Sequence, residues 1–198
     1  MLKIKNQNLV KFGDLFCTTE RGSLQSENAE EGEFDFITAS EEIKKHNAYT
    51  HDKEAIVYAV SAGGSLGRSH YVNGKFIASN LCLVLTPKNP QAYPINMQFY
   101  TIYLNAIRNK IVADISDGTS KLTLDPDDLS KYCIRYFDIA IQNKIAEEYQ
   151  KQITKLKTVL EETKEHYEKA DGTYITHFYC TNPHCGFEGT VSTNLIKN

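Results

Sequence analysis

The chain has 198 residues, of which 41% are hydrophobic and 11% aromatic, enough for one packed domain of ordinary size plus an appendage. Its formal net charge of −3 argues against a protein that coats nucleic acid by bulk attraction, so any DNA binding must use a local basic patch or a basic partner. No apolar run approaches the length of a membrane span and the N-terminus lacks the apolar core of a signal peptide, so a cytoplasmic protein without membrane contact is expected.

The first predicted elements are a strand and a short helix. Residues Phe34–Ile37 alternate in the manner of a half-buried strand. Thr38–Glu41 then has the form of a capping box, with a hydroxyl for the free amides of a helix N-terminus and a Glu three residues later. A short helix through Lys44 and Lys45 is therefore expected.

Two apolar runs, Ala55–Val60 and Leu81–Leu85, predict buried strands, and a glycine-rich connection lies between them. Within this connection Gly63–Gly67 suits a tight turn, and Asn73–Gly74 is a hairpin signal. Polar side chains on a turn between buried strands can meet a ligand, although a solvated loop would have the same composition. The side chains of types that bond base edges or phosphates are Arg68, His70, Lys75, Ser79 and Asn80.

The same connection matches the G-x-S-x-G pattern of a serine hydrolase, with Ser65 as the nucleophile. A nucleophile elbow needs a helix directly after the serine, and the residues that follow are hairpin-like instead. The stretch is also one residue short of a phosphate-binding P-loop, with Arg68 in place of its lysine. The hydrolase stands as an alternative to a structural turn.

Further helices are predicted in the second half of the chain. Asn96 to Ile111 carries apolar residues at helical spacing, and Asp125–Pro126 marks a helix start. From about Phe137 one long helix is predicted, with charged residues opposite a narrow apolar stripe of coiled-coil type that continues to Tyr167. The stripe is expected to contact a partner helix. It consists of Ile145, Tyr149, Ile153, Leu156 and Leu160.

Four short motifs precede the long helix: Lys11–Asp14, Phe36–Ser40, Ala62–Arg68 and Lys75–Asn80. Their order resembles the target-recognition domain of type I restriction–modification specificity subunits, over most of the chain up to about Ala170. Such subunits contain two recognition domains and two spacer helices. No internal repeat is visible here, so the chain looks like one half of such a subunit.

The junction with the long helix departs from the family pattern. Ile134–Phe137 stands where family members usually have Ile-Pro-x-Pro, and Gln142 matches the Gln that follows. Neither proline is present, which leaves the direction of entry into the helix open.

The resemblance implies an α+β fold, with a mixed or antiparallel sheet followed by one long C-terminal helix of coiled-coil type. It implies a target-recognition domain at 1–136, a spacer and dimerisation helix at 137–170 and a short tail of unknown role at 171–198. The implied function is sequence-specific recognition of double-stranded DNA. A non-DNA-binding coiled-coil adaptor is a further alternative.

The chain is not expected to be an enzyme, because it has no catalytic constellation of its own and lacks the Asn-Pro-Pro-Tyr-type motif of a methyltransferase. The resemblance implies that it positions a partner adenine-N6 methyltransferase subunit on DNA. S-adenosylmethionine would belong to that partner, and no cofactor is expected in this chain. The striped helix would pair with a second copy of the chain or with a second recognition domain.

The candidate DNA-contacting residues come from the predicted short helix, the glycine-rich connection, the helix ending near Ile111 and a polar turn at 114–124. Arg108, beside Lys110, is a further candidate for phosphate contact, although cations in a last helical turn also complement the helix dipole. The full set is Ser40, Lys44, Lys45, Gly64, Ser65, Arg68, His70, Lys75, Ser79, Asn80, Lys110, Thr119 and Lys121.

The five cysteines suggest no disulfide framework. Cys17, Cys82 and Cys133 lie among apolar neighbours and are expected to be buried free thiols. Cys180 and Cys185 resemble half of a zinc-ribbon site, but a structural zinc usually has four ligands and the second cysteine pair is missing. A tail without metal is therefore expected, with Cys180 and Cys185 as weak candidates.

Overall fold

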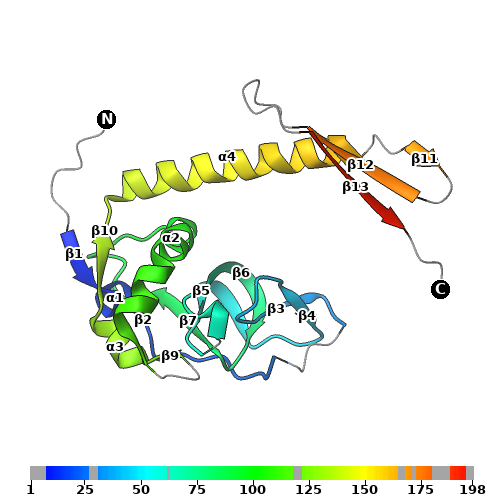
Figure 1. The fold of residues 1–198 in the computed structure, drawn as a ribbon. Coiled ribbons are helices and arrows are strands. Elements are labelled where there is room, and N and C mark those ends of the chain that lie inside the picture. Colours follow the sequence, from blue (N-terminus) through cyan, green and yellow to red (C-terminus); the bar gives the residue numbers. More distant parts are fainter. Residues whose placement is uncertain are drawn as a thin grey trace. The chain divides into compact units, whose positions relative to one another are not determined.

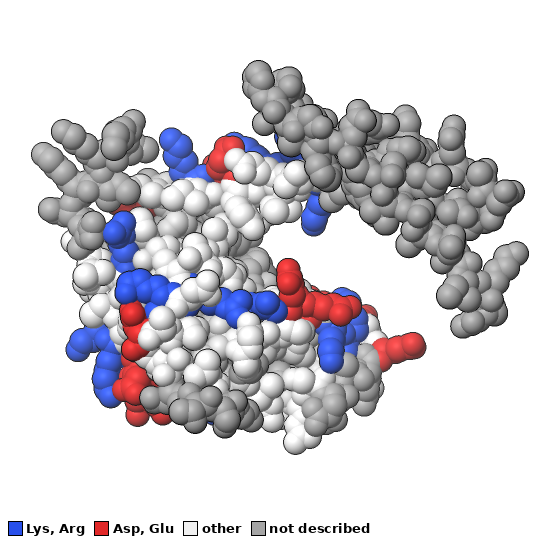
Figure 2. Space-filling model, viewed as in Figure 1, with Lys and Arg blue, Asp and Glu red and all other residues white. Residues whose placement is uncertain are grey.

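The computed structural model describes residues 8–26, 31–61, 63–117, 122–164, 168–170, 173–179 and 188–194. The chain divides into two compact units, Met1–Ala146 and Glu147–Asn198 (Figure 1). Charged side chains of both signs are mixed on the face shown in Figure 2, in keeping with the small net charge.

A six-stranded sheet forms the centre of the first unit (Figure 1), in the order β2-β7-β5-β6-β3-β4. All neighbouring strands are antiparallel except β3 and β6, which run parallel. The predicted α+β fold with a mixed sheet is therefore confirmed. The strands are β2 Phe16–Cys17, β3 Phe34–Ile37, β4 Lys44–His46, β5 His51–Ala59, β6 Ser69–Ala78 and β7 Cys82–Pro87.

The two central strands predicted from apolar runs, β5 and β7, are confirmed and are hydrogen-bonded neighbours. Ile56 and Tyr58 of β5 belong to one hydrophobic cluster, whereas Ala55, Val57 and Ala59 belong to another. Successive residues of a strand point to opposite faces of the sheet. Burial on both faces therefore explains why the β5 sequence is apolar without interruption.

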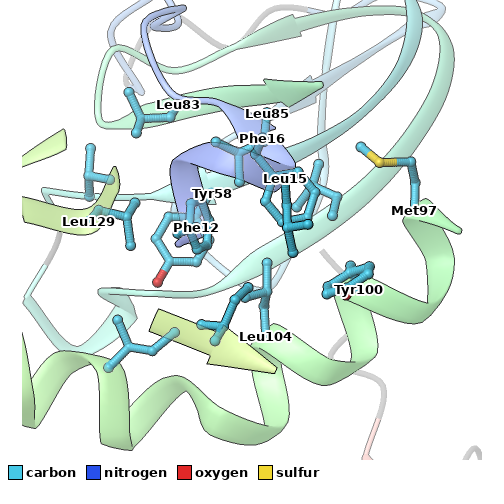
Figure 3. Packing of buried hydrophobic residues seen from close by; sticks show 14 of the residues in the cluster. Phe12, Leu15, Phe16, Tyr58, Leu83, Leu85, Met97, Tyr100, Leu104 and Leu129 are labelled. Carbon is cyan, nitrogen blue, oxygen red and sulfur yellow. The ribbon is translucent and has the colours of Figure 1, made fainter. Parts of the chain in front are cut away.

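The larger cluster lies between the sheet and the helices (Figure 3). Phe12 of α1 (Phe12–Leu15) contacts Phe16 with ring centroids 5.0 Å apart. Phe16 in turn meets Tyr100 of α2 (Met97–Ile115) edge-on at 5.4 Å. These aromatic contacts join α1, the β2 edge of the sheet and α2 into one core.

Both helices predicted in the second half of this unit are confirmed by their caps. The Asn96 side chain accepts a hydrogen bond from Phe99 N at 2.9 Å at the start of α2. Asp125 accepts one from Asp127 N at 2.8 Å at the start of α3 (Pro126–Lys131). Side-chain acceptors at this position satisfy amides that have no partner within the helix.

The remaining elements of the unit are short. β1 (Asn8–Lys11) pairs with β10 (Cys133–Tyr136), and β8 (Ser116–Asp117) pairs with β9 (Thr123–Leu124), both antiparallel. A single 3-10 turn, η1 (Gly63–Ser65), follows β5.

The long helix predicted from about Phe137 corresponds to α4 (Ile139–Lys164), which begins in the first unit and continues into the second. The second unit also contains an antiparallel sheet of β11 (Glu168–Ala170), β12 (Thr173–Tyr179) and β13 (Glu188–Asn194). Coiled-coil pairing of α4 and the domain limits at 136/137 and 170/171 stay predictions. Cys180 and Cys185 lie outside the described residues.

The short helix predicted through Lys44 and Lys45 is wrong, because these residues form β4. β4 pairs with β3, and Lys45 Nζ lies 2.7 Å from Asp35 Oδ1 across the two strands. The Thr38 hydroxyl does not cap a helix, since it hydrogen-bonds the Ser40 hydroxyl at 2.7 Å and accepts from Ser40 N at 3.2 Å. Pairing with a strand therefore prevails over the local capping pattern.

Two other predictions are also wrong. Asn73–Gly74 is not a turn but lies within β6, opposite Lys53 and Glu54 of β5, because β6 continues along the whole of its neighbour. Cys133 is exposed at the start of β10, while Cys17 is partly buried and Cys82 buried. Within the described ranges, every helix is too short or too polar to span a bilayer.

Candidate nucleic-acid interface

The hairpin between β5 and β6 closes at residues 63–68, which we call the glycine turn. Leu66 N donates to Gly63 O at 3.2 Å, and Arg68 N donates to Ser65 O at 3.0 Å. Gly67 has a φ of +76°, a left-handed conformation that favours glycine, and its N–H donates to Ala59 O at 2.8 Å. Gly63 and Gly64 are exposed, with open space where a Cβ would lie, so a ligand can approach their backbone closely.

Two side chains of α2 bind the glycine turn and the first residue of β6. Arg108 donates from Nε to Leu66 O at 2.6 Å and from Nη2 to Gly64 O. Asn105 donates from Nδ2 to Ser69 O at 2.8 Å, while its Oδ1 accepts from Ser69 N at 3.0 Å. The conformation of the turn is thus fixed by a helix that is remote in sequence.

Arg68 places a second guanidinium at the same turn. Its Nη1 lies 3.5 Å from both Ala39 O and Ser65 Oγ, at the limit of hydrogen bonding. Burial lowers the pKa of Arg108, and the positive charge of Arg68 lowers it further. Among the described residues no Asp or Glu forms an ion pair with either arginine. Two neighbouring guanidiniums without carboxylates suit an anionic ligand such as phosphate.

His70 and Ser40 lie beside the glycine turn. His70 Nε2 donates to Ser40 O at 2.8 Å, so the ring is held by the segment that follows β3. Burial lowers the pKa of His70 and the Arg68 charge adds to this effect, while the Ser40 carbonyl and Glu41 oppose it. The imidazole is therefore biased towards its neutral form, which leaves the two arginines as the cations of this site.

Five of the predicted DNA-contacting residues are thereby brought together, although they come from two segments about 25 positions apart. Figure 2 shows basic side chains in a band across the face in view, with acidic side chains at one end. The members of the site are Ser40, Gly64, Ser65, Arg68 and His70, with Arg108 added from α2.

Arg108 and Asn105 show what sequence reasoning missed. Arg108 was predicted as a phosphate contact in the last turn of a helix, but α2 continues to Ile115 and the side chain points to the carbonyls of the glycine turn. Asn105 was not predicted at all. The one signal in the sequence is that Asn105 precedes Arg108 by three residues, a spacing that places both side chains on one face of a helix.

The predicted lysines of β4 and β6 have partners outside this site. Lys44 Nζ donates to Ser26 O at 2.9 Å, and Lys45 is paired with Asp35. Lys75 Nζ lies over the Tyr49 ring, 4.7 Å from its centroid. Cation–π contacts and exposed ion pairs of this kind are weak, so Lys45 and Lys75 remain available for phosphate contact, whereas the Lys44 bond is partly buried.

Ser79 and Asn80, at the end of β6, are placed differently from the prediction. Ser79 is fully buried, and its hydroxyl bonds Ser26 Oγ at 2.9 Å and accepts from Leu81 N at 3.3 Å. A side chain so enclosed cannot contact DNA in this conformation, and its role is to hold the 24–26 segment against the sheet. Asn80 is partly exposed, and its backbone N–H donates to Leu24 O at 2.8 Å.

Lys110 lies on α2 beyond Arg108 and is already engaged. Its Nζ is 2.6 Å from Asp114 Oδ2, which also accepts from Tyr132 OH at 2.6 Å. The hydrogen bond with Asp114 raises the pKa of Lys110. Thr119 and Lys121, predicted in the adjoining polar turn, lie outside the described residues.

The geometry does not support a serine hydrolase at Ser65. Ser65 is the last residue of the 3-10 turn η1, and strand β6 follows instead of a helix. His70, the histidine near it, donates its Nε2 hydrogen to the Ser40 carbonyl. The elements of a nucleophile elbow are therefore missing from this part of the described structure.

Residues 5–167 of this sequence match the family described as type I restriction modification DNA specificity domain. The chain belongs to this family. The matched range contains the six-stranded sheet, the glycine turn, α2 and α4. The family match therefore covers the part of the chain in which the paired arginines lie.

Solved structures of specificity subunits share the fold. The S subunit of the type I restriction–modification system from M. genitalium is 18% identical with a TM-score of 0.67, over 83% of this chain and 44% of that one. The HsdS subunit from Thermoanaerobacter tengcongensis is 16% identical with a TM-score of 0.50, over 80% of this chain and 41% of that one.

A third structure concerns complex assembly and conformational transition of the type I restriction–modification system. It is 16% identical with a TM-score of 0.53, over 79% of this chain and 41% of that one. The chain thus spans less than half the length of these proteins, and at such identities the likeness concerns the fold. No curated protein matches the sequence.

Proposed function

We propose that the chain is a DNA-recognition subunit of a type I restriction–modification system and reads a specific sequence with its glycine turn. The observation that carries the proposal is the pair of guanidiniums, Arg68 and Arg108, at an exposed turn of a chain from the DNA specificity family. The pair supplies the local positive charge that a chain of net charge −3 needs for DNA contact.

The two arginines are suited to different tasks. Arg108 uses Nε and Nη2 to bind the turn, so its remaining N–H groups can hold a phosphate without the turn losing its shape. Within the described residues the contacts of Arg68 are long, at 3.5 Å, so its side chain can reorient towards a guanine edge, which an arginine bonds in a bidentate manner. The exposed Gly63 and Gly64 allow the DNA backbone to come near.

The chain would act without catalysis of its own. In this proposal it positions an adenine-N6 methyltransferase subunit on double-stranded DNA, and that subunit holds S-adenosylmethionine. Residues 1–136 would form the recognition domain, 137–170 the spacer helix and 171–198 a tail of unassigned role. The remaining candidates for DNA contact are Lys44, Lys45, Lys75, Asn80 and Lys110, together with Thr119 and Lys121.

Assembly would use the apolar stripe of α4. Ile145, Tyr149 and Leu156 are 41%, 44% and 58% exposed. Side chains of this kind repeated at intervals of three and four residues are typical of a helix that pairs with another. Ile153 is partly buried, and Leu160 continues the spacing. A second copy of the chain, or a second recognition domain, would cover this stripe.

The test is a selection from random double-stranded DNA by the chain in complex with its methyltransferase subunit. The wild-type complex should enrich one sequence. Arg68→Gln should cost about 1–3 kcal/mol on that sequence and relax preference at one position. Lys88→Gln is the matched control, because Lys88 is exposed and follows the end of β7 that pairs with Phe16, away from the glycine turn.

A second variant separates folding from binding. Arg108→Lys keeps the charge but loses the planar group that binds two carbonyls, so it should weaken binding to all sequences alike. Urea unfolding of each variant shows whether the domain remains folded. No enrichment by the wild-type complex, or an unchanged preference in Arg68→Gln, would contradict the proposal, and the former is the result expected of a coiled-coil adaptor.

A further inference from the structure

Gln142, on the second turn of α4, is fully buried although its side chain is polar. Its Nε2 donates to Phe137 O at 2.7 Å and to Pro94 O at 3.1 Å. Its Oε1 accepts from Asn96 N at 2.8 Å. One side chain therefore joins the start of α4 to the segment before it and to the segment that leads into α2.

Neighbouring groups strengthen the same joint. Asn96 Nδ2 donates to Asn143 Oδ1 at 2.9 Å, while Asn96 also caps α2. The Phe137 ring meets Phe99 and Tyr103 of α2, with centroids 5.2 Å apart in each case. Ala146 of α4 is buried in the large hydrophobic cluster. The first two turns of α4 are thus bonded and packed onto the N-terminal part of α2.

The chemistry of the joint requires a neutral amide in one orientation. Two carbonyl oxygens need a donor, and one backbone N–H needs an acceptor, which a glutamine side chain provides at once. A glutamate of the same shape would place a carboxylate oxygen against Phe137 O and Pro94 O. Buried polar groups left unpaired in this way are strongly unfavourable, so the joint would open.

We propose that Gln142 is a positioning residue, which fixes the direction in which α4 leaves the recognition domain. Where two copies pair through α4, that direction sets the distance between their glycine turns and hence the spacing of the two DNA segments that they read. This last step rests on the proposed function. The first step concerns the chain alone and can be tested without DNA.

The first experiment measures the direction of α4 by pulsed electron spin resonance. Spin labels on unnatural amino acids would replace Lys88 in the domain and Lys151 on α4, both exposed, with excess unlabelled chain to suppress distances between copies. Wild type should give a narrow distance distribution, Gln142→Glu a broad one, and the matched control Gln150→Glu, an exposed glutamine of the same helix, a narrow one. An equally broad wild type, or a narrow Gln142→Glu, overturns the proposal.

A milder variant covers the case in which Gln142→Glu does not fold. Asn143→Leu removes only the exposed bond to Asn96 and should broaden the distribution to a smaller extent. Circular dichroism of each variant shows whether it is folded. A folded Asn143→Leu with the wild-type distribution, beside an unfolded Gln142→Glu, would show that Gln142 supports the fold without directing α4, and this overturns the proposal.

The second experiment tests the consequence for DNA. Complexes with the methyltransferase subunit would select from pools in which the spacer between the two DNA segments varies in length. Wild type should prefer one spacer, and Gln142→Glu should lose that preference while it enriches the same bases. An unchanged spacer preference in the variant overturns the consequence. A wild type that enriches no sequence would contradict the proposed function, while the spin-label distances still decide on Gln142.

Discussion

Histidine 70 is the residue of the site whose charge responds to pH near neutrality. Its Nε2 donates to the Ser40 carbonyl, and burial lowers its pKa below the ordinary value of 6.5. A histidine with a lowered pKa favours folding most when it is neutral. The stabilising effect is therefore complete above pH 6.5 and decreases as the pH falls through the lowered pKa.

We predict that the free energy of unfolding falls more steeply with acid in wild type than in His70→Gln. Urea unfolding at several pH values from neutral to about pH 5 measures this difference. At position 70 the wild-type histidine can take up a proton in this pH range, whereas a glutamine cannot. All other ionisable groups are the same in both chains, so the difference between the two curves isolates His70. Parallel curves would show that the His70 environment is not coupled to folding.

At the level of single residues, sequence reasoning identified the chemical types of the site but not their burial. Arg68, His70 and Ser40 were predicted as site residues and do lie together, because polar side chains at a turn between buried strands have few other positions available. Ser79 was predicted by the same argument but is fully buried. The bond that encloses it comes from Ser26, 53 positions away, and no local pattern contains that information.

Among the elements, the glycine turn has two glycine positions with opposite requirements. At Gly67 the φ is +76° and a Cβ would lie 3.0 Å from Arg108 Cγ, whereas at Gly64 nothing lies within 4 Å. We predict that Gly67→Ala lowers the free energy of unfolding by about 1–2 kcal/mol because of the left-handed backbone. Gly64→Ala, the matched control in the same turn, should change it by less than about 0.5 kcal/mol. Equal effects in urea unfolding would refute this difference.

Strands and capped helices were predictable where one local pattern dominates, as in β5, β7, α2 and α3. β4 was not, because Lys44–His46 takes its conformation from pairing with β3 and not from the capping box before it. The turn predicted at Asn73–Gly74 is absent for a related reason, because β5 pairs with the β6 residues on both sides of these two positions. Long-range pairing decides such segments, and a single sequence does not show it.

For the molecule as a whole, α4 offers a stripe that suits a second copy. We predict that Ile153→Ser with Leu156→Ser lowers the mass measured by light scattering from that of a dimer to that of a monomer, since burial of such side chains would drive the pairing. Lys151→Ser is the control, since its helical position lies opposite the stripe. A wild-type chain that stays monomeric at high concentration without a partner would contradict self-pairing.

Pairing of identical chains has a consequence for the DNA target. A two-fold axis presents two identical reading surfaces, which require identical half-sites in opposite orientation. We therefore predict that selection by the wild-type complex recovers a split palindrome with a constant spacer. Recovery of an asymmetric two-part sequence would show that this chain works beside a different recognition domain.

Two cysteines differ in burial, so the rate at which each is alkylated can report how often the sheet opens. Cys82 lies buried in β7, and burial raises the pKa of its thiol to about 12, whereas Cys133 is exposed on β10. Only a thiolate reacts readily, so Cys82 should be alkylated near neutral pH only when β7 separates from its neighbours. With the other three cysteines replaced by serine, mass spectrometry should show Cys133 modified at once and Cys82 at the rate of that opening. DNA bound at the glycine turn, which closes the hairpin of β5 and β6 beside β7, should then slow the second reaction and leave the first unchanged.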